Sequence, residues 1–289
     1  MLSYLHGFHA GNFADVQKHA AQVLALRMMQ AKPSGIACFD THAGSALYDL
    51  DSDRAQKTGE ADDGIRRLWQ ARPGLAGDDW QPLLDVLASL NRHHDSLSRY
   101  PGSPEWFRRF QRDQDALTLF ELHPTESEHL QSWAGQGNVQ KRGKKSVQVF
   151  REDGLSGLLR QLPPRQPRLM VLMDPSYEVK TEYEQVAETL ARAWKKCRHG
   201  VFLVWYPILT SALEQALKQA IVQGPLKGVL CSEIHLERPP QRGMTGSGML
   251  VVNPPWGFGE RLTQMLESVS GTSGDGLSVK ASLSWLVPE

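Results

Sequence analysis

Several features that assign proteins to broad classes are missing from this sequence. The chain has 289 residues and three cysteines, which are far apart and form no Cys-x-x-Cys pair. This argues against a zinc site and fits a reducing compartment. No apolar run approaches the length of a membrane span, and the N-terminal stretch is too polar for a secretory signal peptide. We therefore expect a soluble, cytoplasmic protein.

Net charge is also lacking, because 32 Lys and Arg residues balance 32 Asp and Glu residues. No global field attracts nucleic acid, so any such partner must contact local patches. The sequence has no internal repeat and no low-complexity tract. A chain of this length can bury a sizeable core, and we expect one domain over residues 1–289.

What the sequence does contain is an alternation of helical patterns and short apolar runs. Residues 14–30 carry apolar side chains at helical spacing and predict a helix. Five runs, each ended by Asp, Glu, Pro or Gly, predict strands at residues 35–40, 116–124, 145–153, 167–175 and 199–207. Such runs are typical of a parallel sheet covered on both faces. Residues 227–237 and 249–253 predict an antiparallel hairpin at one end of that sheet.

One connection in this pattern is unusually long. Roughly seventy residues separate the turn near Ser45 from the second strand, where a parallel crossover needs about a dozen or more. Two helical patterns lie inside this segment. We interpret residues 48–102 as a small helical insertion after the first strand, within the single domain.

The ends of the predicted strands carry the candidate binding residues. In an open parallel sheet, ligands bind beyond the carboxyl ends of the strands, at the switch point. The first strand ends in the turn 40–44, which contains His42 and a glycine, and acids follow the next three strands as Glu121, Asp153 and Asp174. An acid after the second strand suits ribose hydroxyls, and one after the third can accept from an adenine amino group. Because no Gly-x-Gly-x-x-Gly cradle for phosphates is present, S-adenosylmethionine fits better than a dinucleotide.

Two stretches compete for the position at the chemistry. "DPSY" (174–177) and "NPPW" (253–256) both resemble the motif with which enzymes methylate exocyclic amino groups. The fourth strand lies beside the first at the switch point, so we place "DPSY" at the reaction. "NPPW" follows the hairpin strand, far along the sheet order, and we interpret it as a structural turn packed by Trp256.

The chemistry of amine methylation explains why Asp-Pro-x-Tyr suits it. An adenine amino group is a poor nucleophile because its lone pair is delocalised into the ring. The Asp174 carboxylate and the Pro175 carbonyl can each accept one N–H and so aim that lone pair at the methyl group. Asp174 can also take the released proton, and Tyr177 offers a ring on which a flipped base can lie.

Taken together, these stretches resemble a known family. The resemblance covers nearly the whole chain and rests on "MLSYLHGFHAGNFADVQKHA", "DTHAG", "YPGSP", "ELHP", the Asp153-Gly154 pair, "DPSYE", "WYP", "RGMTGSGM", "NPPW" and "SWLVPE". The sequence is similar to the RlmJ family of bacterial methyltransferases, which modify N6 of an adenine in 23S ribosomal RNA. Older labels called relatives proteins of external DNA catabolism. The resemblance implies a Rossmann-like class I fold that uses S-adenosylmethionine and carries a helical insertion.

The resemblance also implies roles for individual residues. Cofactor contacts are implied for His19, His42, Ser103, Glu121, Asp153 and Gly154, with Glu121 at the ribose and Asp153-Gly154 at the adenine end. Asp174 is implied as the proton acceptor and Tyr4 as an RNA contact. We also expect Lys18 to pair with the cofactor's carboxylate. Ser176 stands where the family usually has a second proline, so we expect a looser loop.

Other functions remain open at this point. Asp-Pro-x-Tyr does not distinguish RNA from DNA, so a DNA adenine methyltransferase is one alternative. A non-catalytic nucleic-acid-binding protein linked to external DNA catabolism is another, whereas a nuclease would want a cluster of metal-binding carboxylates. His6, His9 and His19 lack the carboxylate or cysteine spacing of a zinc site, so we predict no metal. The expected partner is 23S ribosomal RNA, free or in an assembly precursor, bound by a monomer.

Overall fold

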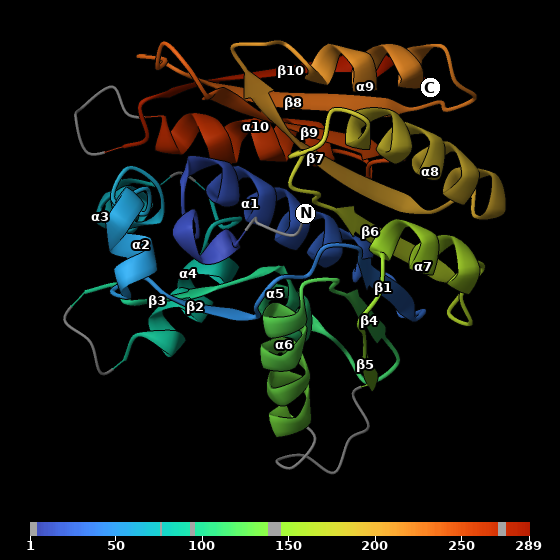
Figure 1. Ribbon diagram of the computed structural model, residues 1–289, viewed down its shortest axis with the longest axis horizontal. Helices are drawn as coiled ribbons and strands as arrows, with labels where there is room; N and C mark the ends of the chain where they lie inside the picture. Colours follow the sequence, from blue (N-terminus) through green and yellow to red (C-terminus); the bar gives the residue numbers. More distant parts are fainter. Residues whose placement is uncertain (1–4, 76, 93–95, 138–145, 271–275) are drawn as a thin grey trace.

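The computed structural model of the protein describes residues 5–75, 77–92, 96–137, 146–270 and 276–289. A central sheet carries helices on both faces, and a group of short elements lies at one side of it (Figure 1). The fold is the α/β class that the alternating pattern predicted. No helix in these described ranges has the length and apolar character needed to span a bilayer.

The central sheet has eight strands in the order β10-β8-β9-β7-β6-β1-β4-β5. Their bounds are β1 (Ile36–Asp40), β4 (Ala116–Phe120), β5 (Ser146–Phe150), β6 (Arg168–Met173), β7 (Val201–Leu209), β8 (Val229–Leu236), β9 (Met244–Val252) and β10 (Val279–Val287). Strands β5, β4, β1, β6 and β7 run parallel, whereas β9 is antiparallel to both β7 and β8, and β10 is antiparallel to β8. This strand order is the one that the resemblance implies, extended by β10 at one edge.

The switch point of the sheet lies at β1, which pairs with β4 on one side and β6 on the other. Asp40 of β1 is in register with Leu119 of β4 and with Leu172 of β6. Glu121 and Asp174 follow those partners by the same two positions, so both emerge at one level of one edge. The predicted neighbourhood of the first and fourth strands is confirmed.

The two faces of the sheet are covered by different sets of helices. One face packs against α1 (Phe13–Met29), α5 (Ser103–Phe110), α6 (Pro124–Gly137) and α10 (Phe258–Val269). The other packs against α7 (Gly154–Gln161), α8 (Glu182–Lys196) and α9 (Glu214–Val222). A short 3-10 helix, η1 (His6–Phe8), precedes α1.

Helix α1 is buried on almost all sides, including its polar residues. Asn12 caps its first turn by accepting from the Asp15 amide at 2.9 Å. Gln17 donates to the carbonyl of Ser232 in β8, and Gln22 donates to the carbonyl of Ser103 in α5. Since buried polar groups need partners, these bonds fix the helix against the sheet. They thereby fix the position of Lys18 as well.

Between β1 and β4 lies the segment that we interpret as an insertion. Its elements are β2 (Leu47–Asp49), α2 (Asp53–Thr58), α3 (Ile65–Ala71), η2 (Arg72–Gly74), α4 (Gln81–Leu90) and β3 (Arg99–Pro101). The antiparallel pair β2–β3 closes the segment at its base and was not predicted. Trp80 is buried and donates from its indole N–H to the Met265 carbonyl of α10 at 3.1 Å. The segment therefore packs on α10 beside the sheet (Figure 1).

The predicted hairpin is present as β8 and β9, but two expectations about the stretch after it are wrong. The first is its distance along the sheet, because β9 lies next to β7 rather than far from the switch point. Asn253 is remote from the carboxyl ends only because β9 is antiparallel. The second is the burial of Trp256, which is 97% exposed. The buried aromatic side chain at this turn is Phe258, the first residue of α10.

We expect Trp256→Ala to change the free energy of unfolding by less than about 0.5 kcal/mol, because the side chain is exposed. Asn253→Ala should cost about 1–3 kcal/mol. The Asn253 amide donates to the carbonyls of Arg198 and Gly200 at 2.7 and 2.8 Å, from a backbone with φ of 52°. Denaturant melts of both variants measure the difference. Equal losses in the two variants would contradict this account.

Candidate active site

A cavity of about 480 Å³ opens at the carboxyl ends of the central strands. Ten residues that the sequence singled out line it together: Lys18, His19, His42, Ser103, Glu121, Asp153, Gly154, Asp174, Pro175 and Tyr177. They come from α1 and from the segments that follow β1, β3, β4, β5 and β6. The structure thus gathers residues from six places in the chain at one site. Tyr4, the expected RNA contact, lies outside the described residues.

The Glu121 carboxylate organises the turn after β1. One of its oxygens accepts from the Gly44 amide and the other from the His123 amide, both at 2.7 Å. Burial raises the pKa of Glu121, although the two amides oppose this effect. Each carboxylate oxygen has a further lone pair. The group can therefore accept from a ligand's hydroxyls while it holds the turn.

The Asp153-Gly154 pair starts α7 directly beside the same turn. Asp153 caps the helix by accepting from the Ser156 amide at 2.8 Å. A Cβ at residue 154 would lie 1.8 Å from the Thr41 carbonyl oxygen. Only glycine allows so close an approach of the two backbones. The pair and the β1 turn therefore form one wall of the cavity.

Two histidines on this wall and on α1 are neutral. Burial lowers the pKa of His42 to about 4, and Thr41 Oγ1 lies 2.8 Å from its Nδ1. Burial also lowers the pKa of His19 well below its usual value. His19 Nδ1 is 2.6 Å from the Tyr100 hydroxyl. Neither ring adds a positive charge to the cavity near neutral pH.

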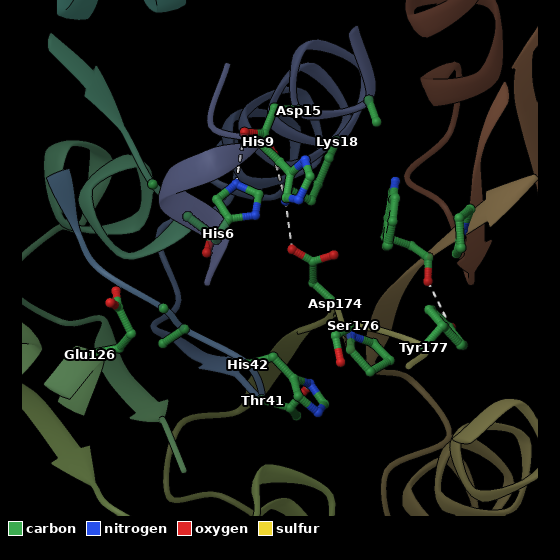
Figure 2. Close-up of a pocket in the computed structure, with 18 of the residues that line it drawn as sticks. His6, His9, Asp15, Lys18, Thr41, His42, Glu126, Asp174, Ser176 and Tyr177 are labelled. Atoms are coloured by element: carbon green, nitrogen blue, oxygen red, sulfur yellow. Dashed lines mark hydrogen bonds and ion pairs between the residues drawn. The ribbon is translucent and has the colours of Figure 1, made fainter. Parts of the chain in front are cut away.

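Three charged groups that line the cavity form a chain of two ion pairs. Lys18 Nζ lies 2.7 Å from Asp15 Oδ1 and 2.5 Å from Asp174 Oδ2. Figure 2 shows Asp174 at the end of its strand with its carboxylate directed toward Lys18 on α1. The contact of Lys18 with the cofactor's carboxylate stays a prediction, and these two ion pairs compete with it.

The pKa values of the three groups follow from this arrangement. Burial raises the pKa of Asp174, and the Lys18 ammonium is the main group that opposes the rise. The pKa of Asp15 is held well below its usual value by His6 and Lys18, which outweigh its burial. The two carboxylates in turn raise the pKa of Lys18. The lysine therefore keeps Asp174 closer to its ionised form than burial alone would allow.

The loop after Asp174 buries Tyr177, whose ring we expected to be open to a flipped base. Tyr177 has a φ of 53°, is 6% exposed, and donates from its hydroxyl to the Trp205 carbonyl at 2.8 Å. Its ring centroid is 4.3 Å from that of Tyr183. One face of the ring is thus occupied, and at most the other can take a base. Ser176 lines the cavity and is half-buried.

Sequence reasoning missed several residues of the site. Asp15 and His6 were not predicted as site residues. In the structure Asp15 pairs with Lys18, and Nε2 of His6 lies 2.9 Å from Asp15 Oδ2. Glu126 is buried and accepts from the Ser45 hydroxyl below the β1 turn. Trp205 lines the cavity and donates to the Ser247 hydroxyl at 2.9 Å. The spacing of Asp15 and Lys18 in a helix could have suggested their ion pair.

The donor and acceptor groups of the cavity fit S-adenosylmethionine. Nε2 of His19 is buried without a hydrogen-bond partner among the described residues, although His19 lines the cavity. Such an atom needs a polar ligand group. Glu121 offers free lone pairs for a diol, and the described turn after β1 lacks the Gly-x-Gly-x-x-Gly pattern of a cradle for two phosphates.

Comparisons with known proteins found relatives that span the chain. The family model described as "Ribosomal RNA large subunit methyltransferase D, RlmJ" matches residues 33–287. Ribosomal RNA large subunit methyltransferase J of Escherichia coli K12 is 37% identical over 100% of both chains, and the protein of the same name from Haemophilus influenzae is 33% identical, also over 100% of both. A crystal structure of a Legionella pneumophila protein is similar with a TM-score of 0.85 and 32% identity, covering 96% of this chain and 98% of that one.

Proposed function

Because the chain belongs to the family of ribosomal RNA large subunit methyltransferases called RlmJ, we propose that it methylates an adenine of 23S ribosomal RNA at the exocyclic N6 amine. Its cofactor is S-adenosylmethionine. The observation that carries the choice of atom is the position of Asp174. Its carboxylate lies at the switch point of the sheet, in the same cavity as Glu121 and Asp153.

The cofactor supplies an electrophilic methyl group, and the residues of the chain orient the amine. Asp174 accepts one N6–H, and the carbonyl of Pro175, to which no described residue donates, accepts the other. Both bonds favour a nitrogen whose lone pair points away from the ring. The Asp174 carboxylate then takes the proton that the amine releases. The stacking of the flipped base on Tyr177 stays a prediction, because Tyr183 and Trp205 lie against the ring and leave it 6% exposed.

Lys18 has a role in this scheme that does not require contact with either substrate. Its ammonium stabilises the ionised form of Asp174, which is the form that accepts a proton. It also fixes the carboxylate in one orientation through a 2.5 Å contact. Holding reactants in line supplies much of the remaining acceleration.

The direct test is methyl transfer from labelled cofactor to ribosomal RNA that lacks its modifications. DNA of matching sequence serves as the second substrate, because the motif alone does not distinguish the sugar. We expect transfer to RNA and none to DNA. Transfer to DNA alone would overturn the assignment. Free RNA and an assembly precursor can be compared in the same assay, and sedimentation tests the expected monomer. A ribosomal substrate would place the reaction in the cytoplasm.

The two acids on the cavity wall give a prediction for cofactor binding. Glu121→Ala and Asp153→Ala should each weaken cofactor affinity by about 1–3 kcal/mol, from lost charge-assisted hydrogen bonds. Titration calorimetry measures this. Asp153→Asn is the matched control for structure, because asparagine still caps α7. Native affinity in both alanine variants would disprove the strand-end assignment.

A further inference from the structure

A second cavity lies at the amino ends of the parallel strands, at the other end of the sheet from the active site. It has a volume of about 380 Å³ and lies where the start of α10 meets β8 and β10. Leu230 of β8 and Leu283 of β10 line it, and a Cβ at Gly259 would contact both. The stretches "NPPW" and "SWLVPE", which the sequence singled out and the active site does not use, meet here. We call it the tryptophan cavity.

Its name comes from two tryptophans that the fold leaves in solvent. Trp256 is 97% exposed and Trp285 is 45% exposed. Most other large apolar side chains of the described residues are buried. Exposed aromatic side chains beside a cavity mark interaction sites, and tryptophan is enriched among the residues that dominate binding energy. Pro254 and Pro255 stiffen the loop that presents Trp256.

The charge of the tryptophan cavity is negative. Glu260 and Glu289 line it, and none of its described lining residues is Lys or Arg. Neither glutamate forms an ion pair within the part of the chain that the structure describes. Arg261, the neighbour of Glu260, pairs instead with Asp79 of the insertion. Two carboxylates beside two indoles thus lack a cation.

We propose that the tryptophan cavity docks an arginine side chain on a segment of a partner polypeptide. A guanidinium stacks on indole faces through cation–π attraction. The same planar group binds carboxylates through paired N–H donors. Both complementary surfaces are present, and the apolar floor takes the methylene stem.

The same features argue against nucleic acid in this cavity. Binding of RNA is dominated by contacts between phosphates and cationic side chains. Here a phosphate would meet Glu260 and Glu289. The cavity also lies at the other end of the strands from the methyl-transfer site. Val252, the last residue of β9, is in register with Phe202 near the start of β7, whereas the methyl-transfer site lies at the carboxyl ends of the parallel strands. A partner can therefore be held while the active site works on RNA.

The test uses the full-length protein and two fluorescein-labelled peptides, one of alternating Arg and Gly and one with Glu in place of Arg. We expect saturable binding of the arginine peptide by fluorescence anisotropy, weaker at higher salt, and no binding of the glutamate peptide. Trp256→Ala and Glu260→Gln should each weaken binding about fivefold or more. Glu267→Gln, an exposed glutamate further along α10, and Val222→Ala on α9 are matched controls and should bind normally.

Several outcomes would overturn the proposal. They are the absence of arginine-peptide binding, native affinity in Trp256→Ala or Glu260→Gln, and Trp256-dependent binding of oligoadenylate RNA. A dimer in sedimentation that Trp256→Ala dissociates would identify a second copy of the chain as the occupant. Methyl transfer by Trp256→Ala should be normal, which separates this proposal from the proposed function. Loss of transfer in that folded variant would place Trp256 in the catalytic machinery instead.

Discussion

Asp174→Ala should abolish methyl transfer while leaving cofactor affinity nearly unchanged. The carboxylate acts on the amine and not on the methyl donor, so its removal takes away the acceptor of both the N–H bond and the proton. We expect the rate to fall by roughly a hundredfold or more, as for loss of a positioned acid–base group. Single-turnover transfer per folded molecule measures this, with the folded fraction taken from a melting curve.

Two further variants sharpen the result. Asp174→Asn should keep a trace of activity, because the amide oxygen still accepts a hydrogen bond but cannot take the proton. Asn253→Ala probes the competing "NPPW" stretch and should transfer at the native rate once it is folded. If Asn253→Ala stopped transfer in folded protein while Asp174→Ala did not, the choice between the two motifs would be wrong.

The layout of the sheet could be predicted because each strand has its own signal within a short stretch of sequence. The parallel strands are short, largely apolar runs that stop at a breaker, and an acid at the stop marks the carboxyl end of β1, β4, β5 and β6. Glu121 and Asp174 could be placed together because parallel strands in register bring their ends to one edge. The β2–β3 pair carries no such signal, since its strands are three residues each and far apart in sequence.

What could not be predicted depends on how separate elements pack. Lys18 and Asp174 are 156 positions apart, and their contact requires α1 to lie over the end of β6. The burial of single aromatic residues has the same origin. Tyr177 is covered because Tyr183 and Trp205 lie against it. Trp256 is exposed, whereas Phe258, two positions later, is buried. The pattern of one stretch does not predict which residues of other elements will pack against it.

The contact between Lys18 and Asp174 gives the second large effect. Lys18→Met should shift the acidic limb of the pH–rate profile to higher pH and lower the rate at neutral pH. Burial raises the pKa of Asp174 and Lys18 opposes that rise, so without the ammonium the carboxyl group stays protonated to higher pH. A protonated group cannot accept the proton. The profile of single-turnover rate against pH measures the shift.

Stability should fall in the same variant, which requires a control. Lys18→Met leaves Asp15 and Asp174 as buried carboxylates without their shared cation, and breaking a buried pair costs about 3–5 kcal/mol. Rates must therefore be normalised to the folded fraction. Lys195→Met, on the exposed surface of α8, should change neither the profile nor the stability. If folded Lys18→Met kept the native acidic limb, the lysine would act only in packing. A displaced limb, partly restored by Lys18→Arg, identifies it as the group that keeps Asp174 ready to accept a proton.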